Sequence, residues 1–235
     1  MEVGLVLKLI KLEIKKFKLA GYVKTIMFIN LGIMIALCGI YFAEKSEGIS
    51  TLGSYKESFE MIGILVRAAF IIFASVLISK LIIDEYRNNT ISILFTYPIN
   101  RKKIMLAKIL LITGFTFVNI VLSSVFIGFM FFLANLGLNF VPEELTSGTL
   151  TESIMQMPLT AFAAAGMGLV PLYFGMIKKS VPVTIVTAIL LVSFANVSVD
   201  EFKLSNILVV PLALGALGLL VAYFSIRNID QVDID

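Results

Sequence analysis

The chain has 235 residues and a net charge of +3, 59% of its residues are hydrophobic, and its mean hydropathy is +0.99. Such a composition leaves too little polar surface to coat a water-soluble globule, so we expect a protein that crosses a membrane several times. With no histidine and the single cysteine Cys38, the chain cannot form an intrachain disulfide or a zinc site of the Cys/His kind. It also lacks the Gly-x-x-x-x-Gly-Lys-Ser/Thr loop that cradles nucleotide phosphates, which excludes an ATPase of that type.

An amphipathic helix is predicted over residues 3–19. Lysines recur at helical spacing on one side of it, and large apolar residues lie on the opposite side. The lysines are Lys8, Lys11, Lys15 and Lys18, and the apolar residues are Val6, Ile10, Ile14 and Phe17. We expect this helix to lie flat on the cytoplasmic leaflet, either as an anchor held by anionic lipid or as an elbow that frames a lateral entrance for substrate.

Six apolar runs follow, and each is predicted to be a membrane span. They cover about residues 25–43, 62–83, 104–134, 154–177, 181–197 and 207–226. Backbone amides in lipid must be paired internally, and none of these runs shows the alternation of a barrel strand, so helices are expected. The predicted fold is an all-α membrane protein with one transmembrane domain over residues 1–235, an interfacial N-terminal helix and no soluble domain.

The orientation of the spans is predicted from lysine and arginine. If the N-terminus is cytoplasmic, 15 of the 19 basic residues lie inside and only four lie outside. The four are Lys45, Lys56, Arg67 and Lys203. Both termini are therefore expected on the cytoplasmic side of a bacterial plasma membrane.

The connection between the second and third spans, residues 84–108, is predicted to contain a short transverse helix. Asn88, Asn89 and Thr90 can cap its start, and Pro98 prevents it from continuing past Tyr97. Its large apolar residues lie at helical spacing, and they are Ile91, Leu94 and Phe95, with Ile93 and Tyr97 nearby. This surface is too apolar for the cytosol, so it lies on lipid or enters a groove in a partner protein.

The same connection resembles the cytoplasmic loop in permease subunits of type-2 ABC transporters. That family pattern is Glu, Gly-Thr, Leu-Leu-Thr, hydrophobic-Pro-Ile/Val-Ser-Arg and a later Lys. The matching residues are Glu85, Asn89-Thr90, Leu94-Phe95-Thr96, Tyr97-Pro98-Ile99, Arg101 and Lys108. The sequence departs from the family at Asn89, where glycine is usual, and in a connection near residues 198–206 that is too short for the re-entrant helical pair of larger members.

The resemblance implies a coupling helix that docks on a separate ATPase subunit. The implied docking residues are Glu85, Asn89, Thr90, Ile91, Leu94, Phe95, Tyr97 and Arg101, with Glu85 and Arg101 as surface anchors at the flanks. ATP and Mg²⁺ would bind the ATPase, and this chain would bind no cofactor or metal and carry no catalytic residue. The implied partners are a P-loop ATPase, a second copy of this permease or a related one, and the lipid bilayer; no nucleic acid is expected.

The spans contain few ionisable residues at mid-membrane depth, which disfavours a carrier driven by protons or sodium ions. Arg67, about two turns into the second span, is the exception. It either snorkels to the headgroups or lines the outer part of a substrate pathway.

The function that the resemblance implies is export of a hydrophobic or amphipathic substrate, such as a peptide, an antimicrobial or a drug. The alternative is a non-transporting membrane sensor or assembly subunit, whose apolar 91–95 face binds lipid or another protein.

Overall fold

The computed structural model describes residues 2–17, 21–47, 54–88, 101–138, 141, 143, 145–196, 198–199, 202–203 and 209–227. These residues are almost entirely helical, which confirms the predicted all-α membrane fold. The helices are α1 (Glu2–Lys16), α2 (Tyr22–Glu47), α3 (Tyr55–Ile78), α4 (Asp84–Arg87), α6 (Arg101–Leu138), α7 (Ser147–Met167), α8 (Val170–Lys178), α9 (Val181–Ala195) and α10 (Val209–Arg227). A π-helical turn over Ser79–Ile83 joins α3 to α4, and the short strands β1 (Ser198–Val199) and β2 (Phe202–Lys203) pair antiparallel between α9 and α10.

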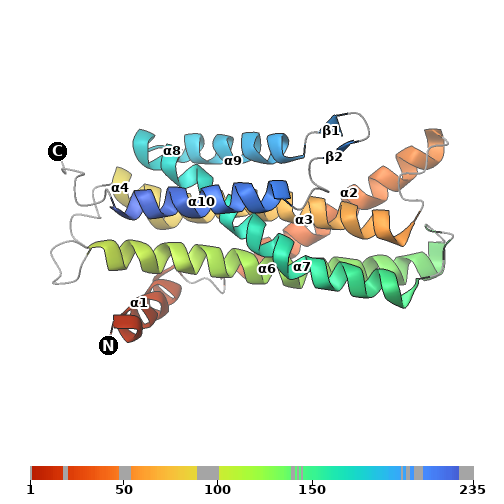
Figure 1. Ribbon diagram of the computed structural model, residues 1–235, viewed down its shortest axis with the longest axis horizontal. Coiled ribbons are helices and arrows are strands. Elements are labelled where there is room, and N and C mark those ends of the chain that lie inside the picture. The colour runs from red at the N-terminus through yellow and green to blue at the C-terminus, as the bar shows by residue number, and fades with distance from the viewer. Residues whose placement is uncertain are drawn as a thin grey trace.

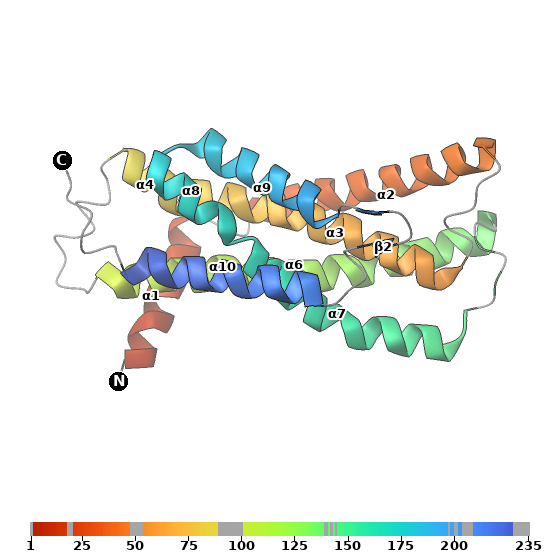
Figure 2. The same cartoon turned by 45° about the horizontal axis from the view of Figure 1, so that its top comes forward.

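The long helices lie side by side along one axis (Figures 1 and 2). At one end, α1 lies beside α4 and the start of α6, and α10 ends at this same end of the bundle. We call it the α1 end. The opposite end holds the end of α2 and the starts of α3 and α7.

Apolar helices occupy the six predicted runs, and one of these helices is short. Within the described residues, five helical stretches are long and apolar enough to cross a membrane, and they are Tyr22–Ala43, Tyr55–Arg87, Lys102–Gly137, Ser147–Lys178 and Val210–Arg227. The remaining apolar helix, α9, has 15 residues, fewer than the roughly 20 that cross the hydrocarbon of a bilayer at full thickness.

Helix α3 is the centre of the bundle. From Ser58 to Ser79 it has no exposed residue, because α2, α6, α7 and α9 surround it. Its start is fixed by a capping box: the Ser54 hydroxyl accepts from the Glu57 amide, and the Ser54 amide donates to the Glu57 carboxylate, both at 3.2 Å. Its aromatic rings pack in series, with Phe73 against Phe70 and against Phe115 of α6.

The fourth predicted span is divided into α7 and α8. The helix breaks at Gly168 and Leu169, and Pro171 lies in the first turn of α8, where a missing amide hydrogen removes no helical bond. Gly168 is required here by packing, since a Cβ at this position would lie 3.0 Å from the Cβ of Ala74 in α3. This break brings α7 onto α3.

Glycines bring α7 and α10 into backbone contact. A Cβ at Gly218 would lie 1.9 Å from the Gly166 carbonyl oxygen, and one at Gly215 would lie 2.7 Å from the Ala163 carbonyl oxygen. Small residues allow this approach between membrane helices, as the alanines and glycines of these two segments predict. The contact makes α7 and α10 one closely packed pair.

At the end opposite α1, a neutral network joins α3, α6 and the chain that follows α6. The Asn135 side-chain amide donates to the Tyr55 hydroxyl oxygen at 2.6 Å and to the Val141 carbonyl at 3.3 Å. Its carbonyl oxygen accepts from the Val141 amide at 2.7 Å. All three residues are buried, so one side chain satisfies both backbone groups of Val141 and holds α6 to the start of α3.

Candidate functional site

The predicted docking segment connects two described helices at the α1 end. Residues 89–100 lie outside the described residues, so the roles predicted for Asn89, Thr90, Ile91, Leu94, Phe95 and Tyr97 stay predictions. Arg101 begins α6, and α4 ends two residues before Asn89. The structure therefore describes what flanks the segment on both sides.

A buried lysine at the start of α6 links these flanks. Lys108 has 2% of its surface exposed, and its ammonium group donates to the Glu85 carboxylate at 2.5 Å. It also donates to the Leu81 carbonyl oxygen at 2.6 Å. Leu81 lies in the π-helical turn Ser79–Ile83, a type of turn that often occurs at functional sites because it disrupts the regular backbone bonding of a helix. The two sides of segment 89–100 are therefore joined by a charged hydrogen bond.

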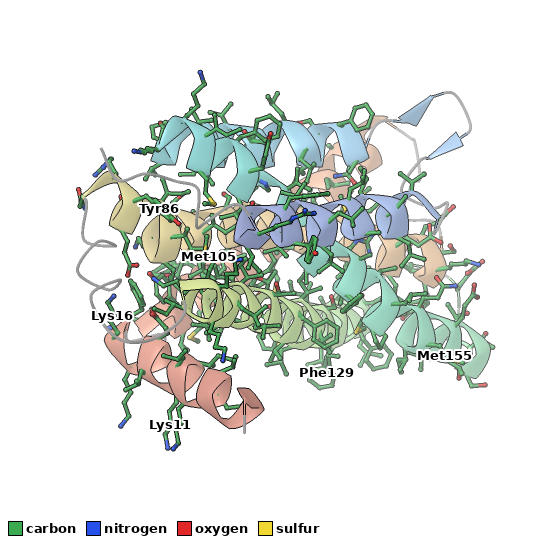
Figure 3. All side chains as sticks on the ribbon, turned by 60° about the vertical axis from the view of Figure 1, so that its left-hand side comes forward. Lys11, Lys16, Tyr86, Met105, Phe129 and Met155 are labelled. Carbon is green, nitrogen blue, oxygen red and sulfur yellow. The ribbon has the colours of Figure 1, made fainter. Side chains whose placement is uncertain are left out.

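Helix α1 joins the same group of charges. Lys16, near the C-terminal end of α1, donates to the second oxygen of Glu85 at 2.7 Å. Figure 3 shows Lys16 on the side of α1 that faces α4, whereas Lys11 points away from the bundle. Glu85 thus bridges α1 and α6, with a different lysine on each carboxylate oxygen.

Glu13 of α1 is the fourth charged group, and it is also buried. One of its oxygens lies 3.8 Å from the Lys108 ammonium, and the other has no hydrogen-bond partner among the described residues. Burial raises the pKa of the Glu13 carboxyl above its ordinary value of 4.5, and the positive charges of Lys108 and Lys16 offset only part of that rise. We call Glu13, Lys16, Glu85 and Lys108 the charged network.

An aromatic ring covers the charged network. The ring centre of Phe17, which follows the last residue of α1, is 5.0 Å from the Lys16 ammonium and 5.6 Å from the Lys108 ammonium. Both distances suit attraction between a cation and the negative face of the ring. Nearby, the Lys80 ammonium lies 5.3 Å from the ring centre of Tyr22 at the start of α2. The start of α2 thus meets the helices of the charged network at the α1 end.

The structure corrects the placement of Glu85. The sequence indicated a surface anchor beside the docking segment, but the side chain is 8% exposed. Two lysine partners offset the cost of removing this carboxylate from water. For Arg101, only its position at the start of α6 is described.

Sequence reasoning missed Glu13 as a site residue, although a signal was present. Glu13 lies between Ile10 and Phe17 on the apolar side of the predicted helix, where a charge needs a buried partner. Lys108 gave a second signal, because it lies inside the third apolar run. Of the predicted apolar side of α1, Val6, Ile10 and Phe17 are partly buried, whereas Ile14 is 41% exposed.

Arg67 is far from the charged network, near the middle of α3. It is partly buried, and its guanidinium lies back along α3 over Gly63, with Nη1 2.9 Å from the position of a Cβ on that glycine. The structure therefore does not bring Arg67 together with Glu85.

The charged network can hold three helices in one arrangement, and it contains no nucleophile activated by a base. Among the described residues, no three His, Cys, Asp or Glu side chains gather closely enough to hold a metal ion. The arrangement is therefore suited to mechanical linkage between α1, α4 and α6.

A family model described as ABC-2 family transporter protein matches residues 9–196. The chain belongs to the ABC-2 transporter family. It is also 41% identical to the uncharacterized protein YcbO of Bacillus subtilis (strain 168) over 227 residues, which are 97% of this chain and 100% of that protein. No solved structure matches the chain.

Membership in the ABC-2 family makes this chain a permease, a multi-pass membrane component of a transporter. The matched range contains all four residues of the charged network and the whole of segment 89–100. The network is thus part of the family region.

Proposed function

We propose that this chain is the permease subunit of an ATP-driven exporter and that segment 89–97 docks on a separate ATPase subunit. The family match over residues 9–196 carries the proposal. A permease without a phosphate-binding loop needs an ATPase from another chain, and the apolar residues Ile91, Leu94 and Phe95 suit a groove in such a partner. ATP and Mg²⁺ bind that subunit.

Two permeases assemble with two ATPases, either as two copies of this chain or as this chain with a related permease. Both termini and the α1 end face the cytoplasm of a bacterial cell. This orientation is supported by the distribution of basic residues: Lys8, Lys11 and Lys15 of α1 and Lys178 of α8 are all exposed at the α1 end. The exported substrate is hydrophobic or amphipathic, such as a peptide or a drug.

The charged network explains how a movement of the docking segment reaches the bundle. The segment leaves α4 just after Glu85 and enters α6 just before Lys108, and these two residues are bonded to each other. A push on the segment therefore acts on both helices as one unit. Lys16 and Glu13 add α1 to that unit, so a helix predicted to lie on the membrane surface moves with the spans.

The docking proposal is tested by co-purification with a candidate P-loop ATPase, to be sought first in the adjacent reading frame. Leu94→Asp and Phe95→Asp each place a charge in the docking surface and should reduce the co-purified ATPase at least tenfold. Lys178→Asp, an exposed substitution at the same end of the bundle, is the control and should retain it.

Undiminished association and transport in both aspartate variants would contradict docking through this segment. The absence of any ATPase that associates with the wild-type chain would contradict the exporter itself. That result would instead favour a membrane sensor or assembly subunit.

A further inference from the structure

Three lysines of α1 form a stripe on the side of the helix that faces away from the bundle. Lys8, Lys11 and Lys15 are three and four residues apart, so they follow one another along one side of the helix, and all three are exposed. Glu13, which packs on Lys108, is two residues from Lys11 and from Lys15 and therefore lies about 200° around the helix from both. Figure 3 shows Lys11 pointing away from the other helices. This lysine stripe and the charged network thus occupy opposite sides of α1.

The packed side of α1 is occupied by the bundle. Among the residues that the structure describes, the ion pairs of α1 belong to the charged network and are made by Lys16 and Glu13. The predicted apolar side of the helix is also in use, because Ile10 and Phe17 pack against the hydrophobic core. A helix anchored by its apolar side in lipid would turn that side away from the protein. The lysine stripe is therefore left for a partner other than this chain.

The contact with α6 sets the depth of α1 in the membrane. Glu13 is level with Lys108, and Lys108 lies 27 residues before Asn135 on the single helix α6, a distance of about 40 Å along its axis. A bilayer is about 40–45 Å thick when its headgroup layers are included. The charged network and the neutral network of Asn135 therefore lie at the two headgroup layers. Helix α1 runs obliquely to the long helices and to one side of them, in the headgroup layer at its own end (Figures 1 and 2).

Exposed apolar residues at the same depth indicate that lipid reaches α1. On α6, Leu106 and Leu110 are exposed, one on either side of the level of the charged network. On α1, Leu7 and Ile14 are exposed beside the lysine stripe. A row of lysines next to exposed aliphatic residues is typical of a helix at the surface of a membrane that contains anionic lipid.

The depth of the lysine stripe favours lipid over the ATPase as its partner. Arg101, where the docking segment enters α6, is seven residues before Lys108 and so about 10 Å nearer the end of the bundle. An ATPase docked on that segment lies outside the headgroup layer, whereas the lysine stripe lies in it. The positive charge of the stripe is complementary to the negative surface of an anionic leaflet.

We propose that the lysine stripe of α1 is a binding site for the headgroups of anionic phospholipids in the leaflet at the α1 end. The lipid phosphates contact the ammonium groups of Lys8, Lys11 and Lys15, and the acyl chains lie against Leu7 and Ile14. Phosphatidylglycerol fits the site better than a zwitterionic lipid, because its headgroup carries no positive charge beside the phosphate. This inference goes beyond export, and it gives the helix that carries Glu13 a preference among membrane lipids.

The chain contains no tryptophan, so a single introduced indole provides a local test. Leu7→Trp places that indole beside the lysine stripe, and lipids that carry bromine near the glycerol end of their acyl chains quench its fluorescence when they are bound next to it. The permease is reconstituted in nanodiscs that contain phosphatidylglycerol and phosphatidylcholine, with one or the other brominated. We expect this position to prefer phosphatidylglycerol by about fivefold, the factor that roughly one lysine contributes near an anionic surface.

Three comparisons separate the lysine stripe from other causes of a preference. Changing Lys8, Lys11 and Lys15 together to glutamine should abolish the preference, and changing all three to arginine should retain it, because arginine keeps the charge. Lys178→Gln removes an exposed cation elsewhere at the same end and should leave the preference unchanged. With Leu122→Trp, at an exposed position of α6, the indole should report no preference.

Equal quenching of Leu7→Trp by the two lipids would overturn the proposal, as would an unchanged preference in the triple glutamine variant. An equal preference at Leu122→Trp would also overturn it, because anionic lipid would then gather around the whole protein. Loss of ATPase co-purification in the triple glutamine variant, together with no lipid preference at Leu7→Trp, would assign the stripe to the ATPase instead. The lipid assay contains no ATPase and measures no transport, so its outcome is independent of the docking test.

Discussion

Two neighbouring helices are joined at both ends of the bundle, but by different chemistry. One helix is α3, which continues into α4, and the other is α6. At the α1 end, the contact is between ions, with Lys108 bonded to Glu85 and close to Glu13. At the opposite end, it is neutral, and Asn135 bonds to Tyr55 and to the backbone of Val141. Both contacts are buried.

The difference shows which end is suited to coupling between helices. Both sides of the Asn135 amide have partners, and it holds Val141 through directional bonds. The charged network instead joins three helices through buried charges, and among the described residues one oxygen of Glu13 has no hydrogen bond. The charged end also flanks the segment proposed to receive the ATPase. We therefore assign the fixed role to the neutral end and the coupling role to the charged end.

The largest effect is expected from removing the central cation. Lys108→Met removes one of the two lysines that bond to Glu85 and leaves Glu13 buried without its nearest cation, so it should destabilise the protein by about 3–5 kcal/mol. Thermal unfolding in nanodiscs measures this loss. Lys11→Met, which removes an exposed lysine from α1, is the control and should shift the melting temperature little.

A second substitution shows whether the loss comes from unpaired charge. The double variant Lys108→Met with Glu85→Met should be more stable than Lys108→Met alone, because it removes a buried carboxylate that has lost its closest partner. If Lys108→Met is no less stable than the Lys11→Met control, the charged network does not hold this end together.

A smaller loss is expected at the neutral end. Asn135→Leu removes the bonds to Tyr55 and Val141 and leaves a buried amide hydrogen of Val141 without its acceptor, which costs about 1–3 kcal/mol. The same unfolding assay applies, with the exposed Asn196→Leu as the matched control. A loss of stability larger than that caused by Lys108→Met would contradict the expectation that the charged end contributes more to stability than the neutral end.

The smallest effect is a change in pH dependence. The folded protein holds the Glu13 proton more tightly than the unfolded chain does, because burial raises the pKa of this carboxyl above 4.5. Between about pH 4.5 and the raised pKa, the unfolded chain therefore binds fewer protons at this carboxyl than the folded protein does. The contribution of Glu13 to the free energy of unfolding falls as pH rises through that interval.

Glu13→Gln should remove this decrease. Measured from pH 4.5 to 7.5, the melting temperature of the wild type should fall relative to that of Glu13→Gln as pH rises. Glu143→Gln, at an exposed site, should track the wild type. Parallel curves for wild type and Glu13→Gln would show that Glu13 does not titrate as a buried group.

The helices could be predicted from the sequence because lipid permits few alternatives. Once the apolar runs from about residue 25 to 226 were recognised, the need to pair every backbone amide made them helices. The division of the fourth run at Gly168 could not be predicted, because it depends on the contact with Ala74 of α3. Pro171 is unfavourable inside a helix, but it does not specify where the helix breaks.

The candidate site was only partly predictable. Glu85 and Lys108 were found through their resemblance to a family loop, yet their pairing requires the antiparallel packing of α3 and α6, which sequence spacing does not specify. Glu13 became part of the site only when α1 was placed against α6, with 3.8 Å between Glu13 and Lys108. Local sequence determines whether each segment forms a helix, but it does not determine which sides of two helices face each other.

The central claim is that the charged network makes α1 and the flanks of the docking segment one rigid unit. The direct measurement is the distance distribution between spin labels at Lys11→Cys and Arg87→Cys, two exposed positions, in a Cys38→Ser background and in complex with the ATPase. The distribution should be narrow and unchanged when nucleotide is trapped with vanadate. It should broaden when Lys16→Met is added but not when Lys15→Met is added. A broad distribution in the starting protein, or equal effects of the two lysine substitutions, would contradict the claim.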